Sequence, residues 1–430
     1  MAPFIEEHYF IVCPGSSTTN IKFGVGESFL PAELEIPTKV YSTADAGVFK
    51  SQGAESDAIY PIVDGVIVDI AAFNFFLKLI YKSILKQHPN ISNIPFLLVS
   101  STQWRKNDIE SITQYVFESM EVNSFAIVPE ALATLFSYGS QPNAVVVNIG
   151  KCKTEINIIV DYSLVKHASK VIPYGGDSIS KKLSTLLPNL SAAQIECLKK
   201  SEIYEVLSDE DKKLSFFGID GLSNDSSDVL DVASIIASGK TQEFIDKKTH
   251  SDGETPNSKL QTNTFTDSDK NTLTVGRERF QGTDELISQI SSAIYASLET
   301  IDDLVKRQEC YDHIILNGNT TKIAGFNEAV NTKIIDEFLV GKEYQQSAAQ
   351  AAFQTFSTTS IQFEQLPKSI KFEKMPEYFT EWKKYGFHDV TLLGAQILAK
   401  FIFGGHNDQM FITRSAYNDK GPLAVWDICF

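Results

Sequence analysis

Apolar and polar positions in the first part of the chain alternate between strand-like and helix-like patterns. Residues 9–13 (YFIVC) predict a short buried strand, and residues 20–25 alternate like a returning strand, so the Gly/Ser/Thr turn between them indicates a hairpin. The spacing of apolar residues further along predicts helices over 68–85, 108–119 and 130–138, and strands over 96–100 and 122–129.

A second strand–turn–strand pattern follows this first half. Residues 144–148 predict a strand, residues 149–153 a turn, and residues 154–161 a returning strand. Because the same unit occurs twice, and further strands and helices follow it each time, the pattern predicts a duplicated α/β fold. We expect two similar lobes that face a cleft.

Polar stretches interrupt the core patterning. Residues 38–57 are rich in Gly and Ser and predict an exposed excursion. Residues 222–269 are rich in Ser, Asn, Thr and Asp, with one apolar island at 229–236, and predict a partly disordered insertion. Residues 345–359 have low complexity and predict a loop with a helical piece. Core patterning returns at 390–403 and 410–413.

Charge and hydropathy exclude several classes of protein. The formal net charge is −16 and no three basic residues are consecutive, so direct non-specific DNA binding is disfavoured and contact with nucleosomal DNA is expected only through partners. No apolar run approaches the roughly 18 residues of a membrane span, and the N-terminus is acidic where a signal peptide is basic. We therefore expect no membrane association, and a cytoplasmic or nuclear location.

The five cysteines give no sign of a metal site or a redox motif. They are scattered, without the close spacing of a zinc knuckle or a CxxC pair, and we expect buried free thiols: Cys13, Cys152, Cys197, Cys310 and Cys429.

Motifs along the chain resemble those of the actin family. Residues 410–430 (MFITRSAYNDKGPLAVWDICF) are similar to the actin C-terminus, with its Gly-Pro and its final Cys-Phe. Four internal motifs agree in the same order: Tyr60-Pro-Ile, residues 113–119 (TQYVFES), residues 274–280 (TVGRERF) and residues 316–321 (LNGNTT). The resemblance spans nearly the whole chain and implies an actin-like two-lobed α/β fold, with duplicated ribonuclease-H-like domains around a central cleft.

The resemblance also implies lobe boundaries. The first lobe would comprise residues 1–139 plus 379–430, with 38–60 as the exposed excursion. The second lobe would comprise residues 140–378, with about 218–270 as the partly disordered insertion.

Two stretches point to a narrower class within the family. Residues 229–239 (VLDVASIIASG) and 376–384 (PEYFTEWKK) resemble the ninth class of actin-related proteins of budding yeasts, which are subunits of the SWI/SNF and RSC chromatin-remodeling complexes. This implies a nuclear, non-catalytic structural or regulatory subunit that acts in transcription regulation. The implied partners are a second actin-related protein (the seventh class), the helicase–SANT-associated helix of the remodeler ATPase, and a small third subunit.

The first hairpin turn corresponds, by this resemblance, to a phosphate loop of actin. Pro14 replaces an acid of actin and supplies neither a carboxylate nor an N–H. Gly15 and Ser17 stay compatible with a phosphate loop, whereas Thr18 is β-branched where a glycine permits close approach.

The second turn has lost its acids as well. Asn148 and Lys151 stand where actin has carboxylates, around a retained Gly150. Because magnesium is held through oxygen ligands, we expect a degenerate ATPase site, no metal, no cofactor and weak or absent ATP binding. Lys151 and Lys153 could instead offset phosphate charge.

Two further parts of the cleft are assigned by resemblance. Gly318 and Thr320 belong to the adenosine loop, with Asn319 in place of its second glycine, and we expect the turn to be kept because the fold needs it. Glu130 stands where actin has the glutamine that orients water. A glutamate there could act as a general base, or could simply be solvated.

A partner groove is implied on the lower face of the fold. Small and apolar residues there would suit an amphipathic partner helix: Phe136, Gly139, Ile397, Leu398, Phe401 and Met410. Filament formation is not expected, because the excursion lacks apolar contact residues and Asp64 replaces the histidine that follows Tyr-Pro-Ile in actin.

Two alternative functions remain at this stage. One is a cytoskeletal actin-related subunit, and the other is an ATPase or kinase of the same superfold with degenerate phosphate loops. The residues Pro14, Asn148 and Lys151 count against both, because such proteins keep the metal-holding acids.

Overall fold

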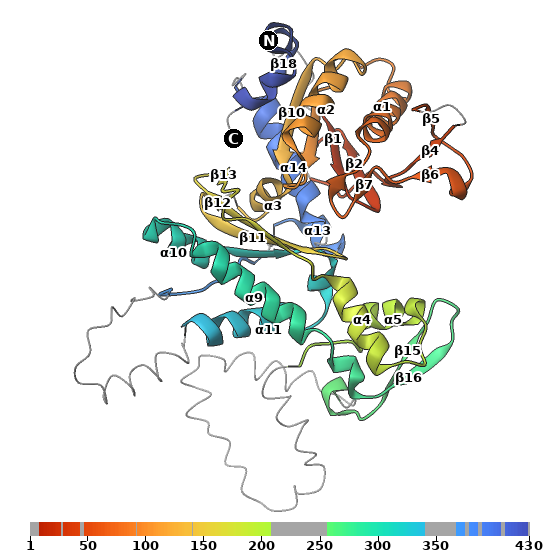
Figure 1. The fold of residues 1–430 in the computed structure, drawn as a ribbon, viewed down its shortest axis with the longest axis vertical. Coiled ribbons are helices and arrows are strands. Elements are labelled where there is room, and N and C mark those ends of the chain that lie inside the picture. The colour runs from red at the N-terminus through yellow and green to blue at the C-terminus, as the bar shows by residue number, and fades with distance from the viewer. Residues whose placement is uncertain are drawn as a thin grey trace, which may run out of the picture. The chain divides into compact units, whose positions relative to one another are not determined.

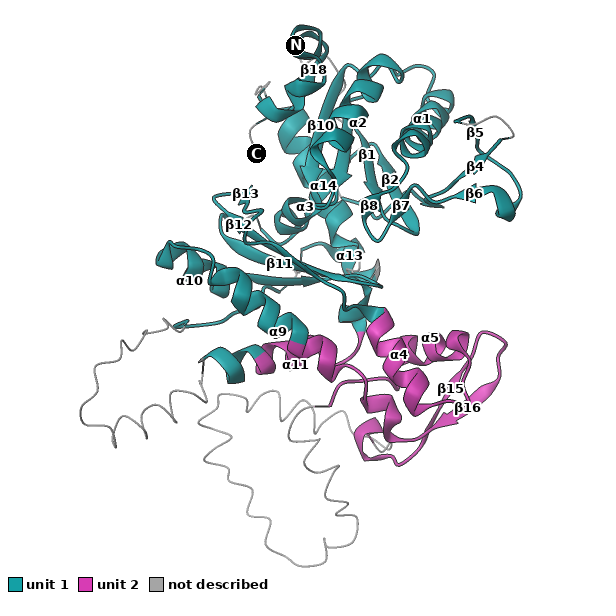
Figure 2. Ribbon diagram, viewed as in Figure 1, with its two compact units in different colours: residues 1–176, 289–322, 334–430 teal, residues 177–288, 323–333 magenta. Residues whose placement is uncertain are grey.

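The structure is a computed structural model. It describes residues 8–26, 29–43, 47–91, 93–139, 141–207, 256–339, 367–374, 378–385, 389–405 and 409–428. The chain forms two compact units (Figure 2): unit 1 comprises residues 1–176, 289–322 and 334–430, and unit 2 comprises residues 177–288 and 323–333. The division into compact units does not test the lobe boundaries that we expect at 139/140 and 378/379. Those boundaries stay a prediction.

The first sheet of unit 1 has six strands in the order β18-β10-β9-β1-β2-β3 (Figure 1). Hairpin one consists of β1 (Phe10–Pro14) and the antiparallel β2 (Thr18–Phe23), to which β3 (Leu34–Pro37) is added. On the other side of β1 lie the parallel strands β9 (Phe96–Ser100) and β10 (Ser124–Pro129), and then the antiparallel β18 (Ile412–Thr413).

Helices cover both faces of this sheet, and alternate residues of its central strands point to opposite faces, so both faces are buried. Phe10, Phe96 and Phe125 pack with α1 (Ile70–Gln87) and α2 (Lys106–Glu118). Ile11 and Leu97 pack with α3 (Glu130–Ser137) and α14 (Val390–Gly404) on the other face.

The second sheet of unit 1 repeats this plan. Hairpin two consists of β11 (Ala144–Ile149) and the antiparallel β12 (Thr154–Val160), and β17 (Ile314–Asn317) lies parallel to β11. The short strands β13 (Ser163–Leu164) and β14 (Lys170–Ile172) both pair with β12. In both sheets the first strand of a hairpin has a parallel neighbour on its other side, which confirms the predicted duplicated α/β class.

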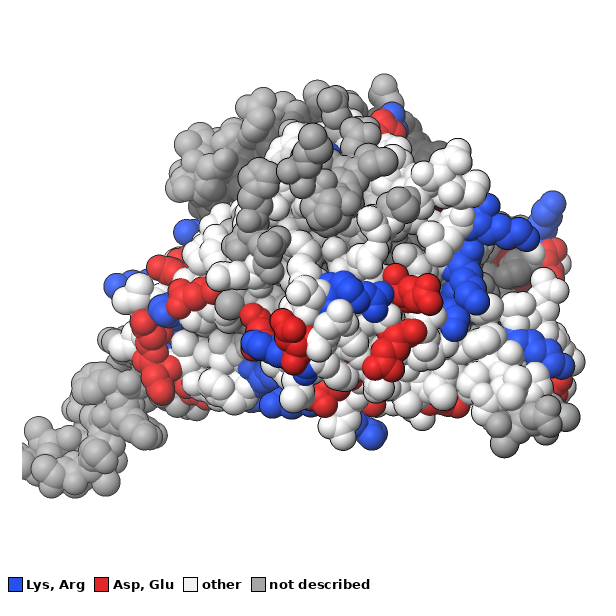
Figure 3. All heavy atoms as spheres, turned by 90° about the horizontal axis from the view of Figure 1, so that it is seen from above, with Lys and Arg blue, Asp and Glu red and all other residues white. Residues whose placement is uncertain are grey.

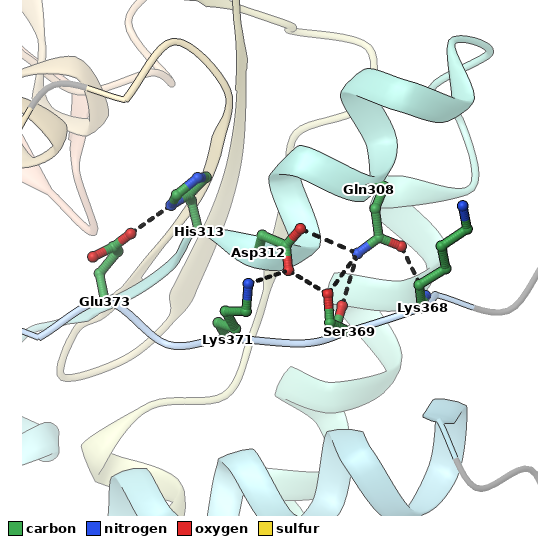
Figure 4. Close-up of polar contacts among 7 residues, drawn as sticks. All are labelled: Gln308, Asp312, His313, Lys368, Ser369, Lys371 and Glu373. Carbon is green, nitrogen blue, oxygen red and sulfur yellow. Dashed lines mark hydrogen bonds and ion pairs between the residues drawn. The ribbon is translucent and has the colours of Figure 1, made fainter.

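The segment at residues 367–374 pairs with β17 through a single parallel bridge, Ile314 with Phe372. Ile314 donates its N–H to the Lys371 carbonyl at 3.0 Å and accepts from the Glu373 N–H at 2.8 Å. Polar side chains of this segment form hydrogen bonds with the end of α10 (Leu304–Asp312). For example, Ser369 Oγ donates to Asp312 Oδ1 at 2.5 Å (Figure 4). The full set in Figure 4 is Gln308, Asp312, His313, Lys368, Ser369, Lys371 and Glu373.

The predicted excursion at 38–60 is a small sheet. Its strands are β4 (Val40–Ser42), β5 (Phe49–Lys50) and β6 (Ala58–Ile59), with a 3-10 turn at η1 (Glu55–Asp57). Val40 is buried, and the ring of Phe49 lies 5.7 Å from that of Phe75 on α1. The tight hairpin of β7 (Ile62–Val63) and β8 (Val66–Ile67) follows.

Unit 2 consists of short helices and a two-stranded sheet. Its elements are α4 (Gly176–Leu186, which starts at the last residue of unit 1), α5 (Ala192–Lys200), η2 (Asn257–Lys259), β15 (Asn263–Thr266), β16 (Thr272–Val275), η3 (Arg277–Phe280) and most of α11 (Phe326–Ile334). The helix α9 (Asp284–Leu298) runs from unit 2 into unit 1.

The guanidinium of Arg279 holds several segments of unit 2 together. Arg279 is fully buried, and its donors reach the carbonyl oxygens of Asn257, Leu260 and Gly276 at 2.6–2.7 Å. Its Nε donates to Asn257 Oδ1 at 2.9 Å. A buried cation is stable here because backbone carbonyls accept its N–H groups.

The remaining elements of unit 1 are short: η4 (Asn319–Lys322), the π-helix η5 (Ile335–Leu339), α13 (Thr380–Tyr385), α15 (Arg414–Lys420) and η6 (Gly421–Asp427). None of the helices in the described ranges combines the length and the apolar character that a bilayer crossing requires.

The prediction of a partly disordered insertion at 218–270 differs from the structure in the last part of this segment, which is folded. Residues 256–270 form η2 and β15, and Phe265 is buried at 4% exposure. Polar residues surround this one apolar position, so the sequence pattern did not indicate a strand. Residues 218–255 of the insertion and the low-complexity stretch 345–359 lie outside the described residues.

Candidate functional site

The turn of hairpin one is closed by its own backbone. Gly15 donates its N–H to the Thr18 carbonyl at 2.9 Å, and a β-carbon at Gly15 would lie 2.7 Å from that oxygen. Pro14 pairs with Thr19 in the strand register and contributes no N–H. Gly15 is therefore required by the turn itself, whether or not a ligand binds.

Neighbouring segments already use the polar groups of this turn. Ser16 Oγ accepts the Gly65 N–H at 2.8 Å, and the Ser17 carbonyl accepts the Thr38 N–H at 3.0 Å. The Ser17 side chain itself is exposed. The turn is thus tied to both the β7–β8 hairpin and the start of the 38–60 sheet.

The turn of hairpin two packs against glycines from two other segments. Gly150 donates its N–H to the Lys153 carbonyl at 2.9 Å, which closes the turn. A β-carbon at Gly175 would lie 2.5 Å from the Gly150 carbonyl oxygen, and one at Gly318 would lie 2.3 Å from the Ile149 carbonyl oxygen. Gly318 also has a φ of +109°, so close packing and backbone conformation both require glycine there.

The adenosine-loop residues continue from β17 into η4. The Thr321 N–H bonds to the Gly318 carbonyl at 3.1 Å, and Thr320 is buried at 8% exposure. Asn317, the last residue of β17, pairs in register with Asn148 of β11. The structure therefore brings the predicted cleft residues Asn148, Gly318 and Thr320 together on adjacent strands and the turn that follows.

Glu130 and Asn148 bond directly to each other. Asn148 Nδ2 donates to Glu130 Oε1 at 2.6 Å. The pKa of Glu130 is raised to about 8, chiefly by burial; the nearby carboxylates of Glu155 and Asp389 also raise it, whereas Lys153 and Asn148 lower it. Glu130 is then mostly neutral at pH 7, and a neutral carboxyl cannot take a proton as a general base.

Asp389 is a second carboxyl of this region that sequence reasoning missed. Burial, with the charge of Glu35 as a lesser cause, raises the pKa of Asp389 to about 6. Asn20 Nδ2 donates to Asp389 Oδ2 at 2.6 Å, which favours the charged form. Asp389 immediately precedes the strongly apolar helix α14. Because an acid at that position is typical of a helix cap, its place in the sequence did not indicate a buried carboxyl here.

The two lysines that could offset phosphate charge differ in the structure. Lys151 is exposed at the tip of hairpin two. Lys153 lies 2.7 Å from Glu155 Oε1 and donates to Gln103 Oε1 at 2.8 Å. Protein groups therefore already hold the ammonium of Lys153, which disfavours its use against a phosphate.

The contact between Lys153 and Glu155 had a signal in the sequence, which is an acid within a strand that is otherwise mostly apolar. Glu155 is 5% exposed within β12, whose other residues are largely apolar. A carboxylate at such a position needs a partner. The pattern did not show that its partners would be Lys153 and Thr102.

The cysteines are not all buried, contrary to expectation. Cys310 is buried and Cys13 and Cys197 are partly exposed, whereas Cys152 is exposed in the turn of hairpin two. Cys429 lies outside the described residues. Over the described ranges, no group of three or more His, Cys, Asp or Glu side chains is placed to hold a metal ion.

The predicted groove residues share one region but differ in exposure. Phe136, Ile397 and Met410 lie half-buried around the core that α3 and α14 form. Phe401 is 55% exposed, whereas Leu398 is 1% exposed and belongs to that core. Leu398 can support a docking surface but cannot contact a partner. A β-carbon added at Gly139 would have nothing within 4 Å.

Comparison with known proteins identifies relatives of this chain. The family model described as Actin matches residues 30–360. The chain is 28% identical over 414 residues to "SWI/SNF and RSC complexes subunit arp9" of Schizosaccharomyces pombe, an alignment that covers 85% of this chain and 78% of the relative. A shorter match, 28% identical over 91 residues, is to "Actin-like protein ARP8" of Saccharomyces cerevisiae and covers 21% of this chain and 10% of that protein. With its duplicated sheets and its match over most of its length, the chain belongs to the actin family.

Proposed function

We propose that this chain is a subunit of an ATP-dependent chromatin-remodeling complex and that it works there as a structural or regulatory part without catalysis of its own. The observation that carries the proposal is the similarity, over 85% of the chain, to a relative named as a SWI/SNF and RSC complexes subunit. A nuclear location and a role in transcription regulation are part of the same proposal.

The chemistry of the two hairpin turns supports a non-catalytic role. Pro14 and Asn148 offer no carboxylate to a hydrated magnesium ion, and the exposed Lys151 adds positive charge. The acid bonded to Asn148 is Glu130, whose pKa is raised. A phosphoryl-transfer site needs metal-held phosphates and an oriented nucleophile, and these residues supply neither.

Nucleotide binding is tested by titrating ATP into the purified chain with and without magnesium. We expect weak or no binding in both conditions. A micromolar affinity that requires magnesium would contradict the proposal and favour an ATPase or kinase of the same superfold.

We propose that the partners bind at the region of Phe136, Ile397, Phe401 and Met410. An amphipathic helix, in this proposal the helicase–SANT-associated helix of the remodeler ATPase, would lay its apolar face against these side chains. A second actin-related protein, of the seventh class, would bind the same helix alongside, with a small third subunit. Contact with nucleosomal DNA would then be indirect.

Affinity purification from the host, with identification of the bound chains, tests the assembly. We expect a remodeler ATPase and a second actin-related protein, whereas recovery of cytoskeletal proteins alone would favour a cytoskeletal actin-related subunit. Phe401→Asp should abolish recovery of the ATPase, because it places a charge on a 55% exposed apolar contact. The matched control is Val305→Asp, at a 67% exposed position on α10. Equal recovery with both variants would contradict the proposed docking region.

A further inference from the structure

Four side chains form a largely buried polar contact between the two sheets of unit 1. We call them the latch: Thr102 and Gln103, which follow β9 of the first sheet, Lys153, which directly precedes β12 of the second sheet, and Glu155, the second residue of β12. Glu155 Oε1 lies 2.7 Å from Lys153 Nζ, and Glu155 Oε2 accepts from Thr102 Oγ1 at 3.0 Å. Lys153 Nζ also donates to Gln103 Oε1 at 2.8 Å.

Both charged side chains of the latch are largely removed from water. The Lys153 side chain is 17% exposed and that of Glu155 is 7% exposed. Charges at such burial are stable only when they are paired and their remaining hydrogen-bonding groups find partners. Both carboxylate oxygens of Glu155 have partners, and Lys153 donates a second bond to Gln103, so the charged groups of the contact are well satisfied.

The ammonium of Lys153 also touches the β7–β8 turn. A β-carbon added at Gly65 would lie 2.5 Å from Lys153 Nζ, so the ammonium packs directly on the Gly65 backbone. Gly65 in turn donates its N–H to Ser16 in hairpin one at 2.8 Å. Contacts therefore run without a gap from hairpin one through Gly65 and Lys153 to hairpin two.

We propose that Lys153 is a built-in cation that fixes the two sheets of unit 1 in one arrangement, so that no bound ligand is needed to hold them together. The positive charge between the hairpins is covalently attached, so it is always present and costs no binding entropy. The arrangement of the sheets then does not depend on the nucleotide state. This inference goes beyond the proposed function, because it concerns the chain alone and requires no partner.

Amide hydrogen exchange and thermal unfolding of the full chain test the latch. In Lys153→Met, Glu155 loses its counter-ion but stays buried, so we expect a clearly lower Tm and about tenfold faster exchange at the Gly65 and Gly150 amides. The double variant Lys153→Met/Glu155→Gln should recover part of the loss, because it leaves no unpaired charge. Added magnesium-ATP should leave exchange at these two amides unchanged in the natural chain.

A surface ion pair provides the matched control. Lys39 and Glu55 lie 2.6 Å apart, with Glu55 68% exposed, so Lys39→Met should change the Tm little. If Lys153→Met does not fold, Thr102→Val removes a single latch hydrogen bond and should still speed exchange at Gly150. The proposal is overturned if the latch variants shift the Tm no more than Lys39→Met, or if magnesium-ATP protects the Gly65 and Gly150 amides. Neither result depends on which proteins the chain binds.

Discussion

Gly394 of α14 lies against the backbone of α3 so closely that a β-carbon at this position would be 1.6 Å from the carbonyl oxygen of Ala133. No side chain can fit at that distance. The two helices cross at this glycine, and together they form the core behind the proposed docking region.

We predict that Gly394→Ala separates α14 from α3 and destabilises the chain by roughly 3 kcal/mol or more, above the usual cost of an extra methyl group in a packed core. Chemical denaturation measures the loss. Gly26→Ala is the control, because nothing lies within 4 Å of its β-carbon position. Similar stabilities for the two variants would show that the helices can move apart freely.

Arg279 gives a second prediction, in unit 2. Arg279→Lys keeps the charge but loses the planar fork that reaches three carbonyl oxygens and Asn257 Oδ1. We expect a loss of about 2–4 kcal/mol, because several buried acceptors are left without donors. Denaturation of this variant beside Lys182→Met, at an exposed position of α4, checks the effect. An unchanged unfolding midpoint for Arg279→Lys would mean that the hydrogen bonds to these carbonyl oxygens make no net contribution to the free energy of unfolding.

Glu130 predicts a dependence of stability on pH. Its pKa is about 8 in the folded chain against an ordinary 4.5, so the folded state holds a proton that the unfolded state releases between these values. The contribution of this proton to stability is complete below about pH 4.5 and is lost as the pH rises through 8.

Glu130→Gln should remove this dependence while it keeps an oxygen for Asn148. We expect the variant to gain at least about 1 kcal/mol of stability relative to the natural chain between pH 5 and pH 8.5, since one pKa unit corresponds to about 1.4 kcal/mol. Urea unfolding at the two pH values measures the gain. Parallel behaviour of the two proteins would show that Glu130 is charged in the folded state.

The thiols should react in an order that the structure sets. Burial raises the pKa of Cys310 to about 12, and burial together with the charges of Asp389 and Glu130 raises that of Cys13, so neither forms much thiolate at pH 8. Cys152 is exposed. In timed alkylation followed by mass spectrometry, we expect Cys152 to react at least about tenfold faster than Cys13 and Cys310. Equal rates in urea would confirm that the fold protects them, and equal rates in the native chain would refute this order.

Local patterns anticipated much of the fold. The strand predicted at 96–100 is β9, and the helix predicted at 108–119 is α2 at Lys106–Glu118, because continuous apolar runs and helical spacing are local signals. Local patterns could not predict contacts between segments that are distant in sequence. Trp382 is fully buried and donates to the Phe29 carbonyl at 2.9 Å, across 353 positions of sequence.

In the candidate site, too, residue identities could be interpreted from the sequence, whereas the contacts between them could not. Residue identity was enough to single out Pro14, Asn148 and Glu130, because their chemistry differs from what the actin resemblance requires. That Asn148 of β11 bonds to Glu130 of α3, and Lys153 to Gln103 after β9, depends on how segments distant in sequence meet in the fold. Sequence spacing does not encode that placement.

Asn257 joins two segments that lie 54 positions apart in sequence. Its Nδ2 donates to the Ile203 carbonyl at 2.8 Å and to Glu205 Oε1 at 2.9 Å, so residues 203–205 lie beside Asn257. Closing a loop between fixed ends costs only about 0.6 kcal/mol more for each doubling of its length. A gene that gains or loses codons between these two fixed points, or carries a fluorescent reporter there, should therefore still encode a stable protein around them.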